Sequence, residues 1–404
     1  MLAIDRLVSL CRRARPKRGG TIACAAACAI AVCAVPAVLA EHLQVSDSGF
    51  GAYEVSLAPW AEGLVVAWYD TRDGNAEIYV RQLDAQGRHK GSEHRITHDP
   101  EQSYEADIDA ASDGLAIAWY DKDVDGRLNA RLAFWSPEDG LRWQRSLSIG
   151  ERATRNPVVR AHAGERIFVA WIEQAEDGRE TVRGAWWRTD GEMLEAPAEL
   201  GPAGATTWNL NAAIDSDGVA YVVYDALVDT DAEELYLARV EGRDVRLARL
   251  THDDGHRSKY PDLALSNGRA AITWFDERDG RREVYLYAGT SSELGEAVEA
   301  RARRITETPG ASIGAYVAWN GDRIGLAWCD DSFGAYDVYF GTFGAHGERA
   351  GEVRRVTETP EHALIPSIRA WNDGFALAWN EVAPGPSGMD DPATRSEVRF
   401  AVIE

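Results

Sequence analysis

Cysteine is scarce in this sequence, and its distribution limits the chemistry available to the protein. The chain has 404 residues and five cysteines, and four of these lie within the first 33 residues. Only Cys329 follows, so the remainder of the chain cannot form an internal disulfide. Related segments of the chain carry an aromatic residue where Cys329 stands. We therefore expect Cys329 to pack in the core and not to act as a nucleophile.

Positive charge is also in short supply once the first 40 residues are set aside. The whole chain has 43 Lys and Arg against 65 Asp and Glu. The first 40 residues hold six of the former and one of the latter, so the remainder carries a formal charge of about −27. Such an acidic body is repelled by phosphate backbones and anionic lipid surfaces, which predicts no nucleic-acid partner. Divalent ions, cationic ligands or basic partners fit this charge better.

Residues 1–40 form a leader of different composition. Six basic residues between Arg6 and Arg18 precede an apolar run over residues 21–40, which ends Val38-Leu39-Ala40. This pattern predicts a signal peptide that is cleaved after Ala40, and therefore a secreted or periplasmic protein. The alternative is an uncleaved anchor, because about 20 apolar residues approach the length that spans a membrane. The run is rich in Ala and Cys, not Leu, which favours cleavage.

An aromatic residue followed by an acid recurs throughout the rest of the chain. The aromatic positions are Trp68, Trp119, Trp171, Tyr224, Trp274, Trp328 and Trp379. The steps between them are 50 to 54 residues long. Self-similarity at a fixed period of this length is typical of a repeat architecture.

Each repeat follows the same plan of four short strands. In the second repeat an alternating segment at 104–109 and a turn at 112–114 lead into the apolar segment 115–119. An Asp- and Gly-rich turn and a third strand at 128–135 come next. Short strands at this spacing predict an all-β fold, a seven-bladed β-propeller of four-stranded antiparallel blades. The blade cores are expected at about 52–80, 104–135, 157–187, 209–240, 261–288, 314–343 and 365–404.

The last repeat breaks off after its third strand, while residues 42–46 resemble a fourth strand without a blade. We therefore predict that the segment at about 42–46 joins the C-terminal blade and closes the ring. Closure removes the exposed sheet edge that would otherwise promote aggregation. Residues 41–404 then form a single domain, which we expect to be a monomer.

The first repeat, W-Y-D-T-R-D-G-N-A-E-I-Y over residues 68–79, is similar to repeats of exported bacterial propellers of the sialidase-like (Asp-box, or BNR) family. Residues 136–143 contain a degenerate Asp-box, with Glu138 in place of Asp. The resemblance implies a propeller fold and export. It also implies, as an alternative function, a carbohydrate-active enzyme of the glycoside hydrolase or lyase type. The arginine cluster, tyrosine nucleophile and glutamate of sialidases are not found as a set, so no catalytic residue is assigned.

One Asp-rich turn is the strongest candidate for a metal site. Asp121, Asp123 and Asp125 alternate before Gly126, and carboxylates in this pattern can surround Ca²⁺. The alternative is an ordinary acidic turn, because the acid after the aromatic recurs in most repeats and can accept backbone N–H groups of the turn that follows. No other cofactor is indicated.

Five further residues are candidates for ligand binding. Trp60, Trp319 and Trp371 lie near the ends of expected innermost strands in contiguous blades, where an aromatic patch would bind a sugar or a protein. Packing beneath the hairpins is the alternative for these side chains. Arg160 and Arg369 are expected to face the central channel, where acids of the ring would pair with them.

These observations favour an exported, non-enzymatic propeller that binds a protein, a glycan or an ion through its loop face or its channel. The alternative is the sialidase-like hydrolase or lyase, and a third hypothesis is a structural envelope protein. The candidate residues alone do not distinguish the three.

Overall fold

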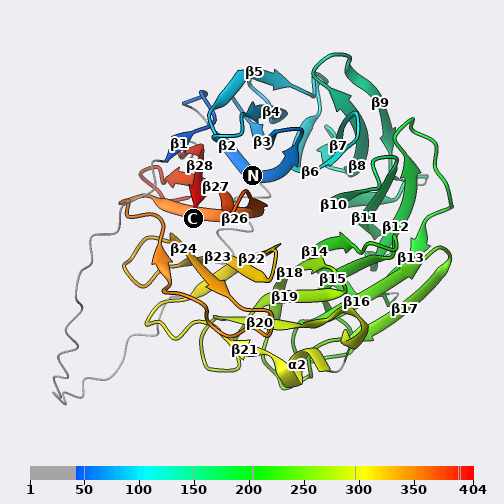
Figure 1. The fold of residues 1–404 in the computed structure, drawn as a ribbon. Helices are drawn as coiled ribbons and strands as arrows, with labels where there is room; N and C mark the ends of the chain where they lie inside the picture. The colour runs from blue at the N-terminus through cyan, green and yellow to red at the C-terminus, as the bar shows by residue number, and fades with distance from the viewer. Residues whose placement is uncertain are drawn as a thin grey trace.

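A computed structural model describes residues 42–404 apart from residues 50, 149, 203, 296, 390 and 392; the leader lies outside the described residues. Seven four-stranded sheets follow one another around a central channel (Figure 1). Every strand pairs antiparallel with its neighbour in its sheet. The predicted seven-bladed propeller is confirmed. No helix in the described part of the chain has the length and apolarity to cross a membrane.

Within blades 1 to 6 the strands run in chain order from the channel outward. Blade 1 comprises β2 (Ala52–Trp60), β3 (Gly63–Asp70), β4 (Glu77–Leu83) and β5 (His89–Arg95). Blade 2 comprises β6 (Gln102–Ala111), β7 (Gly114–Lys122), β8 (Leu128–Ser136) and β9 (Gly140–Ser146). Blade 3 comprises β10 (Ala153–His162), β11 (Arg166–Gln174), β12 (Glu180–Arg188) and β13 (Ala198–Glu199). Blade 4 comprises β14 (Thr206–Ile214), β15 (Ala220–Leu227), β16 (Glu234–Glu241) and β17 (Asp244–Arg249).

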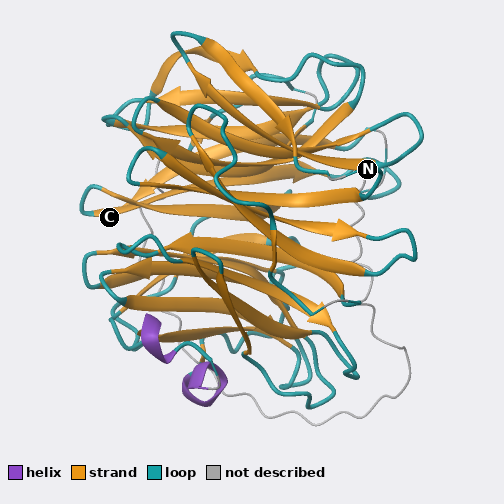
Figure 2. Ribbon diagram, turned by 90° about the vertical axis from the view of Figure 1, so that its right-hand side faces the viewer, coloured by secondary structure: helices purple, strands orange, loops and turns teal. Residues whose placement is uncertain are grey.

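The remaining blades include the only helical segments of the described residues. Blade 5 comprises β18 (Ser258–Ser266), β19 (Arg269–Asp276), β20 (Glu283–Thr290) and β21 (Arg303–Arg304). The 3-10 turn η1 (Ser291–Glu293) and helix α2 (Ala297–Arg301) lie between its last two strands, at the periphery of the ring (Figure 2). Blade 6 comprises β22 (Ser312–Asn320), β23 (Arg323–Asp330), β24 (Asp337–Phe343) and β25 (Arg354–Arg355). Blade 7 comprises β26 (His362–Trp371), β27 (Gly374–Ala383), β28 (Arg395–Ile403) and β1 (Leu43–Gln44).

The second strand of each blade forms the core of the molecule. All eight residues of β3 are buried, because blades on both sides cover it. The aromatic side chains of the repeat lie between blades, and the fully buried ones include Trp68, Trp119, Trp171, Trp274 and Trp379. Burying a large apolar side chain stabilises a fold by roughly 1.5–3 kcal/mol. The repeated aromatic residue therefore holds adjacent blades together.

A carboxylate in the third strand fastens the outermost strand of the blade. In blade 1, Glu77 is fully buried and accepts a hydrogen bond from Arg95 at 2.6 Å. Thr97 donates to the same carboxylate and accepts the N–H of Ile78 at 2.9 Å. We call this arrangement the rim clamp. It recurs in blades 5 and 6 with the acids Glu283 and Asp337. In blade 4 the threonine bond to Glu234 is kept, but Arg249 lies 3.7 Å from that carboxylate.

The ring closes as the sequence predicts. Leu43 of β1 pairs with Phe400 of β28, and β1 is the outermost strand of blade 7. The backbone N–H of Val45 donates to the carbonyl of Val398 at 2.8 Å. The N–H of Val398 in turn donates to the buried hydroxyl of Ser46 at 2.9 Å. The N-terminal strand thus supplies the missing edge of the last blade.

Candidate functional site: a cavity at the mouth of the channel

Every innermost strand has a β-bulge near its start. The register shifts after residues 53, 104, 155, 207, 259, 313 and 364, at equivalent points of the seven blades. Non-glycine residues with left-handed backbone stand at several of these bulges, namely Glu54, Glu105, Asn156, Tyr260 and Ile365, with φ between 50° and 55°. Such bulges redirect side chains and occur next to functional sites.

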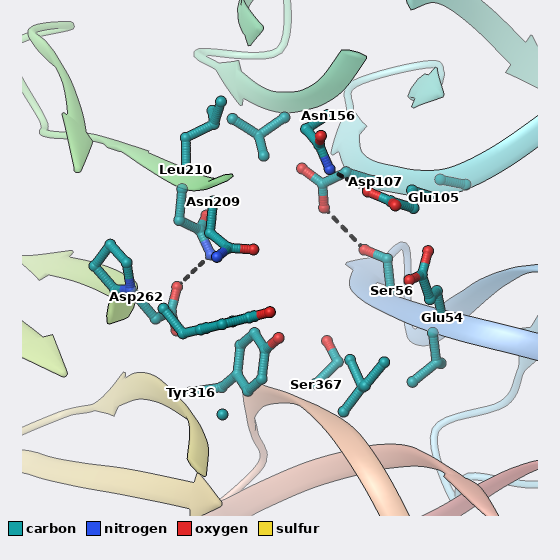
Figure 3. A pocket seen from close by; sticks show the side chains of 18 of the residues that line it. Glu54, Ser56, Glu105, Asp107, Asn156, Asn209, Leu210, Asp262, Tyr316 and Ser367 are labelled. Carbon is teal, nitrogen blue, oxygen red and sulfur yellow. Dashed lines mark hydrogen bonds between the residues drawn. The ribbon is translucent and has the colours of Figure 1, made fainter. Parts of the chain in front are cut away.

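The bulges surround a cavity of about 230 Å³ at one end of the channel. Ala52 pairs with Asp70, so this end lies on the same face as the hairpins between the second and third strands. Figure 3 shows Glu54, Glu105 and Asp107 on one wall and Asp262 and Tyr316 on the opposite wall. All seven blades contribute lining residues, so the site exists only in the closed ring.

Beneath the bulges a chain of hydrogen bonds connects the innermost strands of blades 1 to 6. The hydroxyl of Ser56 donates to Asp107 at 3.0 Å, and Arg160 forms an ion pair with Asp107 at 2.6 Å. Arg160 also donates to Asn211, which donates to Asp262. Asp262 accepts the backbone N–H of Val317 at 2.7 Å. We call this chain the inner belt; it fixes the orientation of the polar side chains at the channel.

Arg369 is the contribution of blade 7 at this level, and it stands outside the inner belt. Its guanidinium lines the cavity and donates to the carbonyl of Ile368 at 2.8 Å. None of the described residues places a carboxylate within ion-pair distance of it. Burial, and then the nearby charge of Arg160, lower the pKa of the Arg369 guanidinium. The cavity therefore contains a cation whose charge is not neutralised by direct contact.

The sequence predicted that both arginines face the channel and pair with acids of the ring. The structure brings both to the cavity, and it shows the ion pair for Arg160 but none for Arg369 among the described residues.

Asp262 is the acid of the cavity with the clearest electrostatic perturbation. The residue is 7% exposed, and burial raises the pKa of its carboxyl to about 6. The hydrogen bond from Val317 and the charge of Arg160 lower that pKa, but they do not offset the burial. A carboxyl with a pKa near 6 can hold a proton close to neutral pH, as a general acid must.

The three tryptophans proposed as a ligand patch occupy separate places at blade interfaces. Trp60 packs edge-on against Trp135 of blade 2, with ring centroids 6.1 Å apart. The indole of Trp319 donates to the carbonyl of Ala264 in blade 5 at 3.2 Å. Trp371 packs against the hydrophobic cluster shared by blades 7 and 1. No ring contact joins the three within the described residues, and a ligand-binding role stays a prediction.

The acids of the proposed calcium turn face different partners. Asp121 is buried and accepts Trp119 at 2.7 Å and Arg131 at 2.6 Å. Asp123 accepts the backbone N–H groups of Asp125 and Arg127, as in an ordinary Asx turn. Calcium binding by this turn stays a prediction.

Within the described residues, one group of three possible metal ligands has its ligand atoms within 4.8 Å of one another, namely Asp99, Glu101 and Asp121. Arg131 already pairs with both Asp121 and Glu101, which supplies positive charge to that group.

The degenerate Asp-box forms the hairpin between β8 and β9. The Ser136 hydroxyl accepts the backbone N–H of Asp139 at 3.1 Å, which closes the turn. Trp143 stacks on Phe134 and donates to the carbonyl of Thr189 in blade 3 at 2.7 Å. The segment therefore joins two blades, and none of its residues lines the channel-mouth cavity.

Sequence reasoning missed most of the cavity wall. Glu54, Glu105 and Asn156 were not candidates, although they are 51 residues apart and share one position of the repeat. Asp262 and Tyr316 also went unnoticed. When the repeats are aligned, the residue at the position of Glu54 varies from blade to blade. That variation was the signal in the sequence that could have indicated the site.

Comparisons with known proteins support the fold. No protein-family model and no curated protein matches the chain. The structure is similar to the polysaccharide lyase Uly1 (TM-score 0.54, 10% identity, 87% of this chain and 90% of the other). It is also similar to the endosialidase of phage phi92 (0.51, 10%, 91% and 69%) and to the GH93 α-L-arabinofuranosidase of Fusarium graminearum (0.51, 14%, 76% and 94%). At these identities the likeness to sialidase-like and other propellers shows the fold alone.

Proposed function

We propose that the protein is an exported, non-enzymatic propeller that binds an anionic, hydroxyl-rich ligand, such as an acidic saccharide, in the channel-mouth cavity. The proposal rests on one observation: the guanidinium of Arg369 lines the cavity and forms no ion pair among the described residues. A carboxylate or sulfate of the ligand would neutralise it with charge-assisted hydrogen bonds. This proposal departs from the expectation of a cationic ligand, because it rests on the local charge of Arg369 and not on the net charge of the chain.

The remaining lining suits the body of a sugar. Hydroxyl and amide groups of Ser56, Asn156 and Ser367 reach the cavity from three blades, and Tyr316 adds an aromatic face. Drug-sized ligands usually occupy roughly 300–1,000 Å³, and this cavity measures about 230 Å³. We therefore expect a single sugar residue to enter, with the rest of a chain lying over the loop face.

The test is calorimetric titration of the purified protein with glucuronate-containing oligosaccharides and with their methyl esters. The esters keep the shape of the ligand and lose its charge, so we expect affinity to fall at least tenfold. Arg369→Gln should produce a similar loss. Arg246→Gln, which removes an exposed arginine of blade 4, is the matched control and should bind normally. Equal binding of acid and ester by the native protein would contradict the proposal.

Glycoside cleavage is a second candidate function, and Asp262 favours it. Its carboxyl, with a pKa of about 6, lies across the cavity from Glu54, Glu105 and Asp107. Two sets of carboxyl groups facing each other across a sugar site can act as acid and as base. Asp262→Asn should then retain saccharide binding and lose the release of reducing ends. Binding without any turnover by the native protein would leave the non-enzymatic function.

A further inference from the structure

A second cavity, of about 520 Å³, lies between blades 5 and 6 and does not belong to the channel. Trp328, Asp330 and Tyr339 line it from blade 6, and residues 304–308 line it from blade 5. Arg349 and Val353 complete the wall. The proposed saccharide site does not involve any of these residues.

The corresponding place in blades 1 and 5 is filled by an arginine of the chain. Arg72 pairs with Asp70 at 2.6 Å, and its guanidinium lies 4.5 Å from the ring centre of Tyr79. In blade 5, Arg278 pairs with Asp276 at 2.6 Å and lies 5.1 Å from the ring centre of Tyr285. In both blades the tyrosine is stacked on the repeat tryptophan.

Blade 6 keeps the tryptophan, the tyrosine and the acid of this site and lacks the arginine. Tyr339 stacks on Trp328 with centroids 6.0 Å apart, and Asp330 follows two residues after Trp328. Ser332 stands where blades 1 and 5 have Arg72 and Arg278. The cavity is the space that the guanidinium fills in the other two blades.

The backbone of the hairpin is the same in the three blades. The N–H of Ser332 donates to Asp330 at 2.9 Å, as the N–H of Arg72 donates to Asp70 at 3.0 Å. Gly334 has a φ of 107° and Gly74 a φ of 97°, and each closes the same kind of turn. The side chain at this position is therefore one difference that opens the cavity; Arg72 and Arg278 also pair with Glu93 and Glu299, whereas Arg349 and Val353 line the cavity in blade 6.

The polar groups of the cavity lack the partners that their counterparts have. Asp330 is 1% exposed and accepts Ser312, Thr308 and the Ser332 N–H, but no cation pairs with it among the described residues. The acid at this position pairs with an arginine in most other blades, as Asp70, Asp121, Glu173, Asp276 and Glu381 show.

The tyrosine of blade 6 differs from its counterparts in the same way. The Tyr285 hydroxyl donates to Asp279 at 2.5 Å, whereas Phe333 stands at that position in blade 6 and is 71% exposed. No hydrogen bond of the Tyr339 hydroxyl is found in the described part of the chain. An aromatic face and a carboxylate are thus left without the cation that they contact elsewhere.

We propose that this cavity binds a guanidinium group supplied by a ligand, which stacks on Tyr339 and pairs with Asp330. A planar cation on an aromatic face beside a buried carboxylate combines cation–π attraction with a charge-assisted hydrogen bond. Arg304 lines the cavity but already pairs with Glu283 at 2.8 Å. Arg349 donates to the carbonyl of Ile305 at 3.4 Å and is available for a carboxylate carried by the same ligand.

The test is titration of the purified protein with L-arginine and agmatine, followed by calorimetry and saturation-transfer NMR. Citrulline, which replaces the guanidinium with a neutral urea group, is the ligand control and should not bind. A short peptide with one internal arginine separates the two sources of the group. Tighter binding of the peptide assigns the site to a protein partner, and tighter binding of free arginine assigns it to a small molecule.

Two variants use the repeat as their own control. Ser332→Arg should fill the cavity from within, raise the melting temperature and abolish arginine binding. Arg278→Ser should open the same cavity in blade 5 and raise the stoichiometry of arginine from one to two. Binding that survives Ser332→Arg, an unchanged stoichiometry in Arg278→Ser, or equal binding of citrulline and arginine would overturn the proposal. The Arg278→Ser result decides the question if Ser332→Arg does not fold.

Discussion

The buried carboxylates of the rim and those of the channel differ in how far their surroundings repeat. At the rim, Glu77, Glu283 and Asp337 each accept an arginine and a threonine from the same positions of their own blades. At the channel, Asp107 pairs with an arginine of the next blade, whereas Asp262 accepts an amide and a backbone N–H. Surroundings that repeat, as in blades 1, 5 and 6, serve stability, and varied surroundings are available for a ligand. Repeated surroundings therefore indicate carboxylates that belong to the scaffold, and varied surroundings indicate those that belong to the candidate site.

Removing a rim carboxylate should have the largest effect on stability. Glu77→Ala leaves Arg95, Thr97 and Asn75 without their shared acceptor. Breaking a buried ion pair by deleting one partner costs about 3 kcal/mol. We expect that loss in the free energy of unfolding, measured by urea denaturation. Glu62→Ala, at an exposed turn of the same blade, should change it by no more than about 0.5 kcal/mol.

The charged form of the channel acid Asp262 should destabilise the fold, whereas the charged form of the rim carboxylate Glu77 stabilises it. Its pKa of about 6 in the folded protein exceeds the ordinary 3.8, so the folded state binds the proton more tightly than the unfolded state. Its contribution to stability is therefore greatest at low pH and is lost as the pH rises from about 4 to about 6, by about 2–3 kcal/mol in all.

Asp262→Asn removes this titration. The difference in unfolding free energy between the variant and the native protein should therefore shift in favour of the variant as the pH rises from 4 to 8. Urea denaturation at pH 4, 6 and 8 measures that difference. A difference that does not change with pH would show that Asp262 titrates alike in both states.

Within the rim, blade 4 provides the finer comparison. Arg249 lies 3.7 Å from Glu234, whereas Arg95 lies 2.6 Å from Glu77. Burial raises the pKa of Glu234 to about 7. Glu234→Gln should therefore change stability at pH 8 by less than about 1 kcal/mol, because the charge it removes is poorly compensated.

The matched change Glu77→Gln should cost more, since it breaks a close ion pair. Thermal unfolding of the two glutamine variants at one pH makes the comparison direct. Equal losses would mean that the longer ion-pair distance in blade 4 has no energetic consequence.

The fold was largely predictable from the sequence because each blade repeats one physical requirement. The aromatic residue of the repeat must be buried between blades, and the acid that follows it accepts hydrogen bonds at the hairpin, as Asp70 does from Arg72. Seven copies and one displaced strand leave few other arrangements. The position of β1 beside β28 followed from counting strands alone.

The site was less predictable, for a reason that lies in the bulges. An extra residue in a strand shifts the side chains that follow it to the other face, and a local pattern of apolar and polar residues does not mark where the shift occurs. The sequence pattern around Glu54 and Glu105 therefore predicts only ordinary alternating strands. Arg160 and Arg369 were recognised because an arginine on an innermost strand is conspicuous, but their different pairing depends on the neighbouring blades.

The exception in blade 6 illustrates the same limit. Ser332 in place of an arginine is visible in the sequence, but serine is also an ordinary turn residue. Only the positions of Tyr339, Asp330 and the adjoining blade show that the change leaves a cavity.

The closure of the ring also governs how the molecule is assembled. The contact between Ser46 and Val398 joins residues 352 positions apart. A chain emerging from the ribosome can build blades 1 to 6 in order, but it cannot complete blade 7 until its final strand has been synthesised. The earlier blades bring the two ends together, which spares most of the roughly 5 kcal/mol that closing so long a loop would cost a disordered chain. Closure thus depends on the length of the chain: a product that ends before β28 lacks the strand with which β1 pairs.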